Sequence, residues 1–72
     1  MLKLEIGKSY ICKPIGVNYE VIGCVERTYT NIAVIFVESY DQRDRLAVYD
    51  SKFRLLVKLD EIYTVAESAL VS

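Results

Sequence analysis

The sequence feature that most constrains the fold is a series of short segments in which apolar residues recur at every second position. A period of two is typical of β-strands, and the β-branched and aromatic residues that favour strands are abundant here. These segments follow one another at intervals of about ten residues. In a chain of 72 residues, this spacing favours a small five-stranded barrel over a sandwich, which usually needs about seven strands and more chain.

The length of the chain predicts a single domain, which we place at residues 1–65, with residues 66–72 as a C-terminal tail. A hydrophobic fraction of 53% argues against disorder. No apolar run approaches the roughly 20 residues of a membrane-spanning helix. The first six residues alternate charged and apolar side chains and lack the apolar core of a signal peptide. We therefore expect a cytoplasmic protein without membrane contact.

The expected strands share period-two alternation or a short apolar run. They are residues 9–12, 19–27, 32–37, 46–49, 53–59 and 63–65. Residues 32–37 are apolar on both faces, which is typical of a central strand. Before the last strand, residues 60–62 predict one helical turn with Asp60 as its N-cap.

The segments between the expected strands carry turn signals. Pro14 lacks an amide donor and Gly16 permits a positive φ, so this part of the chain should be a loop. Asn31 tolerates the left-handed conformation and predicts a hairpin. Gly23, inside a strand, predicts a bulge or bend that helps a small sheet to curl. Residues 39–45 form the longest polar stretch and should be an exposed loop.

The alternation in residues 53–59 predicts which side chains face the core. Phe53, Leu55, Val57 and Leu59 should point inward, whereas Arg54 and Lys58 should point to solvent. Leu56 is the apolar exception on the outward side. An outward leucine between two basic residues indicates a surface that could contact another molecule.

Three short segments are similar to parts of the SH3-like barrels of KOW type. They are Gly7-Lys8 before the first strand, Gly23-Cys24-Val25-Glu26, and Ile32-Ala33-Val34-Ile35. The resemblance lies in the pattern and spans roughly residues 7–65. It implies an all-β, five-stranded SH3-like barrel with a short helical turn before the last strand. It also implies a module that binds nucleic acid or protein, with no catalytic residues.

The residues present offer little for catalysis. The chain has no histidine, which excludes a histidine base, a Ser-His-Asp triad and a histidine-ligated metal. Its three glycines are too far apart for a phosphate-binding loop. Cys12 and Cys24 are expected to be free, buried thiols, because a disulfide would require an oxidising compartment. We expect no enzyme, no catalytic residue, no metal and no cofactor.

Two carboxylates in the polar stretch need separate consideration. Asp41 and Asp44 could pair as acid and base or hold a hard cation. Arg43 and Arg45 alternate with them, however, so an exposed, solvated loop with surface ion pairs is the favoured interpretation.

The candidate binding face combines outward apolar, aromatic and basic side chains from the second half of the chain. It comprises Tyr40, Arg43, Arg45, Tyr49, Arg54, Leu56 and Lys58. Six tyrosines and a net charge of −1 favour a protein partner. Self-association through an edge strand or through the apolar tail residues 69–71 is one form of this hypothesis.

Nucleic-acid binding is the alternative function. Residues 43–58 carry five basic against two acidic side chains, and Tyr40 or Tyr49 could stack on bases. The negative net charge weighs against it, because nucleic-acid-binding domains are usually clearly basic. An ordinary solvated sheet face is the simpler explanation of the same residues. No small-molecule substrate is evident.

Overall fold

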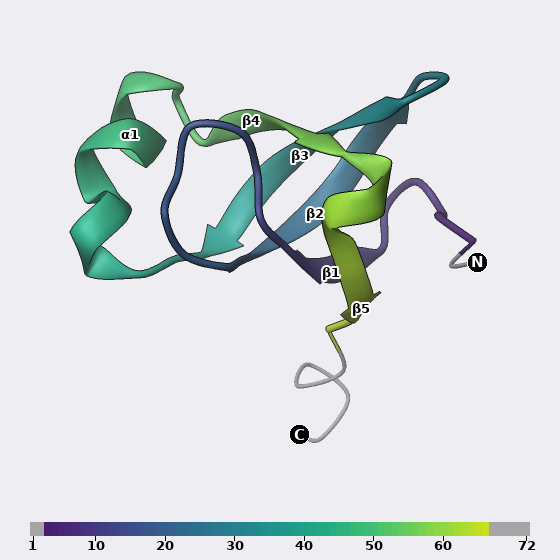
Figure 1. Cartoon of the computed structure of the whole chain (residues 1–72), viewed down its shortest axis with the longest axis horizontal. Helices are drawn as coiled ribbons and strands as arrows, with labels where there is room; N and C mark the ends of the chain where they lie inside the picture. The colour runs from purple at the N-terminus through teal and green to yellow at the C-terminus, as the bar shows by residue number, and fades with distance from the viewer. Residues whose placement is uncertain (1–2, 67–72) are drawn as a thin grey trace.

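A computed structural model of the chain describes residues 3–66. Its elements in chain order are the strands β1 (Ser9–Cys12), β2 (Val21–Thr28) and β3 (Ile32–Ser39), the 3-10 helix η1 (Gln42–Asp44), the helix α1 (Arg45–Asp50), β4 (Arg54–Lys58), the 3-10 helix η2 (Leu59–Glu61) and β5 (Ile62–Val65). All five strands belong to one antiparallel sheet in the order β4-β3-β2-β1-β5 (Figure 1). The predicted all-β class is confirmed.

The period-two pattern places one set of side chains of each strand in the core. Val21, Gly23 and Val25 of β2 are buried, while the residues between them are half-buried. On β3, Ala33 and Ile35 are fully buried in the same way. The core has eleven members: Tyr10, Cys12, Val17, Val21, Val25, Ala33, Ile35, Val37, Val48, Val57 and Ile62.

One loop and one short helix cover the core side of the sheet. The loop of residues 13–20 crosses in front of the strands in Figure 1. It buries Pro14 and Val17, and α1 adds Val48. We call the side of the sheet that these elements cover the inner face, and the opposite side the outer face.

The sheet is not closed into a barrel. Its edge strands, β4 and β5, do not pair with each other. Between them runs the loop after β1, where the amide of Ile15 donates to the carbonyl of Leu56 (2.8 Å) and the amide of Lys13 donates to the carbonyl of Glu61 (3.0 Å). The loop thus occupies backbone groups that a closing strand pair would use, and the expected closed barrel is not formed by the described residues.

The expected strand at residues 46–49 is wrong, because these residues belong to α1. A run of only four residues fits one helical turn as well as a short strand. The preceding segment was expected to be an exposed loop, but Gln42–Asp44 forms η1. Asp41 starts this turn as its N-cap, with its carboxylate accepting a hydrogen bond from the amide of Arg43.

The end of α1 is a Schellman motif. The amide of Lys52 donates to the carbonyl of Tyr49 (3.0 Å), and the amide of Phe53 donates to the carbonyl of Val48 (2.9 Å). Both Lys52 (φ 59°) and Phe53 (φ 68°) adopt left-handed backbone conformations. Glycine usually occupies the first of these positions, because a side chain there costs roughly 1–2 kcal/mol.

Three smaller expectations have mixed outcomes. The β2–β3 hairpin is confirmed, with the amide of Tyr29 donating to the carbonyl of Ile32 (2.8 Å), but Asn31 is not left-handed. The helical turn before the last strand is confirmed as η2, although Lys58 rather than Asp60 precedes it as N-cap. Residues 67–72, including the apolar residues 69–71 of the expected tail, lie outside the described part of the chain.

Gly23 of β2 lies beside the buried Ile35 side chain of β3. The pairing of these strands shifts between Ile22 and Gly23, which confirms an irregularity at the predicted position. A Cβ atom added at Gly23 would lie 2.5 Å from Cδ1 and 3.1 Å from Cβ of Ile35. Glycine therefore leaves room for the buried Ile35 side chain on the inner face.

We predict that Gly23→Ala lowers the free energy of unfolding by about 1–3 kcal/mol, because the new methyl group overlaps the Ile35 side chain. Ile35→Val removes Cδ1, which is the closest atom. The double variant should therefore lose less stability than the sum of the two single variants, as measured by urea unfolding. Additive losses would show that the overlap is not the cause.

Candidate functional site

Four aromatic side chains form a cluster beside the start of β4. Phe36, Tyr40, Tyr49 and Phe53 have neighbouring ring centroids 5.2–6.4 Å apart, with the shortest distance between Tyr49 and Phe53. These separations lie in the range of favourable aromatic pairs. The cluster is not fully buried, since Tyr49 is 55% and Phe36 38% exposed. The four rings therefore support one another by packing, while part of Tyr49 and of Phe36 stays accessible to solvent.

The Schellman motif positions this cluster. Because the chain turns through left-handed Lys52 and Phe53, the Phe53 ring contacts Phe36 from β3 and Tyr49 from α1. Of the predicted site residues, the cluster unites Tyr40 and Tyr49. Tyr40 is half-buried and its pKa is raised, first by its interaction with the neighbouring hydroxyl of Tyr49.

The outer face of β3 and β4 carries three more of the predicted residues. Arg54, Leu56 and Lys58 all point outward and are exposed, as the alternation predicted. In the register they lie opposite three residues of β3, namely Phe36, Val34 and Ile32. Leu56 is 45% exposed and lies beside Val34. A continuous apolar row therefore runs from Leu56 through Val34 and Phe36 to the aromatic cluster.

Charges on the outer face are mixed. Nε of Arg54 lies 3.0 Å from a carboxylate oxygen of Glu26. The same guanidinium is 5.5 Å from the Phe36 ring centroid, within cation–π range. Glu38, near the end of β3, accepts a hydrogen bond from the Ser9 hydroxyl. Acidic side chains thus accompany the basic ones on this surface.

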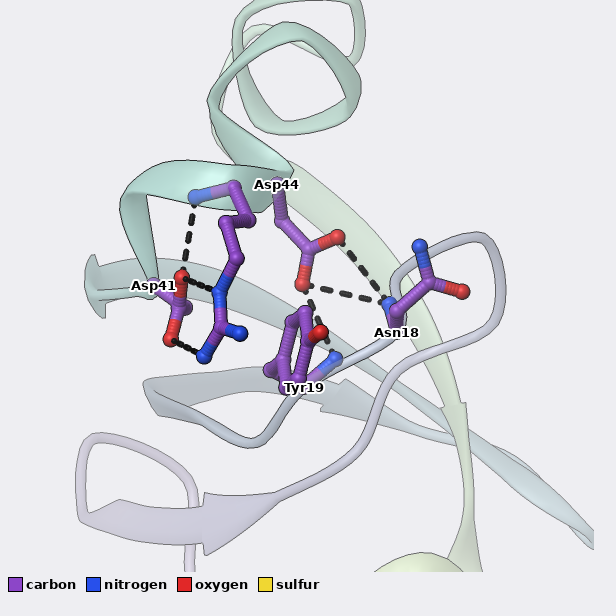
Figure 2. A network of polar contacts seen from close by, with 5 residues as sticks. Asn18, Tyr19, Asp41 and Asp44 are labelled. Carbon is purple, nitrogen blue, oxygen red and sulfur yellow. Dashed lines mark hydrogen bonds and ion pairs between the residues drawn. The ribbon is translucent and has the colours of Figure 1, made fainter.

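Arg43 does not join the outer face. Its guanidinium makes two 2.9 Å contacts with the Asp41 carboxylate (Figure 2) and lies 3.9 Å from the centroid of the Tyr19 ring. It is therefore held against the end of the loop that covers the inner face. Arg45 begins α1 and is exposed. The four basic residues of the predicted stripe are thus not gathered on one surface.

Asp44 is buried, contrary to the expectation of a solvated loop residue. Only 4% of it is exposed. Its carboxylate accepts hydrogen bonds from the backbone amides of Asn18 (3.1 Å) and Tyr19 (2.9 Å), as Figure 2 shows. All these donors are neutral amides of the loop between β1 and β2. Asp44 therefore fastens that loop to the helical segment and has a structural role.

The two thiols lie on opposite sides of the sheet. Cys12 is fully buried on the inner face, and burial raises its pKa to about 12. Cys24 is half-buried among outward side chains, and its pKa is also raised by burial. Both are free, and a disulfide between them would have to pass through the sheet. Neither has the low pKa of a nucleophilic thiol.

Within residues 3–66, no three Cys, Asp or Glu side chains are placed together to hold a metal ion. In the same range, no helix has the length and apolar character needed to cross a membrane. In comparisons with known proteins, the chain matches no protein-family model, no curated protein and no solved structure.

Sequence reasoning missed Phe36 and Phe53 as surface residues. Phe36 could have been found, because period two within the apolar run of β3 places it on the same side as Val34. Phe53 was expected to face the core, and it does pack against the core. Its contact with Phe36 depends on the left-handed backbone at Lys52 and Phe53, which no sequence pattern indicates.

We predict that Asp44→Asn lowers the free energy of unfolding by about 2 kcal/mol, because hydrogen bonds to a charged acceptor contribute about 1.5–3 kcal/mol. Asp50→Asn is the matched control, since Asp50 is exposed on α1, and it should change stability by less than about 0.5 kcal/mol. Urea unfolding of both variants measures the difference. Equal effects would contradict a structural role specific to Asp44.

The Arg43 guanidinium lowers the pKa of Asp41 to about 2. A carboxyl whose pKa is lowered by folding stabilises the fold above its ordinary pKa of 3.8, and this contribution is lost as the pH falls toward about 2. We predict a carboxyl NMR titration midpoint near 2, shifted toward the ordinary value in Arg43→Gln. An unshifted midpoint in that variant would show that Arg43 is not the cause.

Proposed function

We propose that the chain is a non-catalytic domain that binds protein through the outer face of β3 and β4 and the adjoining aromatic cluster. The observation that carries the proposal is the continuous row of accessible apolar side chains, with Phe36 38%, Leu56 45% and Tyr49 55% exposed. Contiguous exposed apolar surface marks interaction sites, whereas single exposed apolar residues do not. Aromatic anchors are also enriched at protein interfaces.

The charges support a protein partner over nucleic acid. Arg54 is paired with Glu26, and Arg43 with Asp41. Glu38 adds a further negative charge near the same surface. With a net charge of −1, the chain lacks the long-range attraction to phosphates on which most non-specific nucleic-acid binding depends. Nucleic acid therefore remains the second candidate.

We propose that this domain is an open form of the SH3-like barrel. Five antiparallel strands with a 3-10 turn ahead of β5 support this proposal, because the resemblance implies both features. Such barrels commonly serve as binding modules. We further propose a cytoplasmic location, because the half-buried Cys24 carries a free thiol and reducing compartments keep thiols in this state.

The proposal predicts that immobilised chain retains proteins from a cell lysate and that Leu56→Glu abolishes this retention. A charge in the apolar row should prevent its burial against a partner. The matched control is Ile6→Glu, because Ile6 is 67% exposed and precedes β1, which β2 separates from β3 and β4. Quantitative mass spectrometry of the retained proteins measures the effect. Equal retention by both variants would contradict binding through the outer face.

The same preparation tests the second candidate. Labelled single-stranded RNA and DNA are titrated at low salt, where even non-specific phosphate contacts are visible as a change in fluorescence anisotropy. We expect no binding. Salt-dependent binding that Lys58→Glu weakens would favour nucleic acid over protein as the partner.

A further inference from the structure

We propose that the partner of the outer face is a second copy of this chain, related by a two-fold axis that lies between the two sheets and runs perpendicular to their strands. This inference rests on the proposed function, because it names what binds at the same surface. Such a contact is isologous, so one patch must be complementary to itself. Three properties of the outer face meet this requirement.

The first property is the apolar character of the sheet on both sides. An antiparallel sheet with one face in water usually alternates apolar and polar residues. On β3, however, the outward side chains Ile32, Val34 and Phe36 are all apolar, and the inward Ala33 and Ile35 form core. On β2, Ile22 and Cys24 extend the outward apolar area. A second layer packed on this face would complete the arrangement in which sheets bury both faces.

The second property is shape. The molecule measures 34 × 30 × 17 Å, so it is flat. Figure 1 looks down the shortest axis, onto the broad side that the loop of residues 13–20 crosses. A broad side of these dimensions can supply the roughly 800 Å² that each partner buries in a standard interface. Two such sheets stacked face to face would lie about 10 Å apart.

The third property is the distribution of charge along the strands. Lys58 lies opposite Ile32 at the hairpin end of β3, whereas Glu38 lies near the other end of that strand. Val34, Phe36 and Leu56 occupy the space between them. A two-fold axis perpendicular to the strands reverses their direction in the second copy. Lys58 of each copy therefore faces the end that carries Glu38 in the other, while the apolar rows meet at the centre.

A like partner accounts for these properties together. A purely basic or acidic ligand would meet like charge at one end of the face, and an apolar ligand would bury Lys58 and Glu38 without oppositely charged partners, which is costly. The pair formed by Arg54 and Glu26 is already satisfied within one copy, so it can be buried with less loss. In the two-fold arrangement, Lys58 and Glu38 pair between the copies, and Arg54 and Glu26 pair within each copy.

Sedimentation velocity of the full chain over a range of concentrations tests the inference. We expect a reversible rise from the monomer mass of 8.3 kDa to twice that value. Leu56→Glu at the centre of the face should raise the dimer dissociation constant at least about tenfold. Ile6→Glu, which changes an exposed residue before β1 and outside this face, should leave the dissociation constant unchanged. Circular dichroism confirms that each variant is folded.

A charge exchange tests the two-fold arrangement itself. Lys58→Glu alone should weaken the dimer, because it places two carboxylates together. Adding Glu38→Lys should restore the dimer, because the exchanged charges are again opposite across the axis. Restoration is a result that loss of folding or a general change of net charge would not produce.

Three outcomes would overturn the inference. One is a single 8.3 kDa species at concentrations up to about 1 mM, a concentration at which even weak complexes form. Another is a dimer that Leu56→Glu does not weaken, and the third is a charge exchange without restoration. If the chain is a monomer that retains lysate proteins and Leu56→Glu abolishes this retention, only the identification of the partner as a second copy is overturned. If Leu56→Glu does not reduce the retention, the proposed function is overturned.

Discussion

The carboxylate of Asp44 is the contact on which the arrangement of this small domain depends. It is buried and accepts backbone hydrogen bonds from Asn18 and Tyr19, which lie 26 and 25 residues earlier in the chain. Through it, the loop that follows β1 is tied to the helical segment that follows β3. The same loop reaches the edge of β4 through the amide of Ile15. One side chain therefore holds together the elements that cover the inner face.

Because these elements cover the inner face, the apolar side chains of the outer face stay accessible, as the proposed binding function requires. Within residues 3–66, one layer covers the sheet, and domains of this size bury only about 60% of the surface of the unfolded chain. The covering loop and α1 both lie on the inner face, where Val17 and Val48 complete the core. The apolar residues on the other side of β3 consequently have no cover within residues 3–66. A second layer from outside the chain would stabilise them.

The sequence predicted those parts of the fold that depend on a repeating pattern. Period-two alternation or a short apolar run identified all five strands, and period two identified the outward position of Leu56, because each strand side meets a single environment over several residues. The helix α1 was not predicted, since residues 46–49 show too little of either period to distinguish helix from strand. The role of Asp44 was not predictable either. Its partners are backbone amides, which carry no signal in the sequence.

The aromatic cluster shows how a local backbone strain serves the surface. Left-handed Lys52 and Phe53 are the two non-glycine residues with positive φ in the described chain, and such conformations persist only where the surroundings compensate for them. Here two hydrogen bonds at the end of α1 and the contacts of the Phe53 ring provide the compensation. Without this turn, the Phe53 ring would not lie against Phe36 immediately before the start of β4. The strain therefore joins the aromatic cluster to the outer face, and the two elements together make up the proposed binding surface.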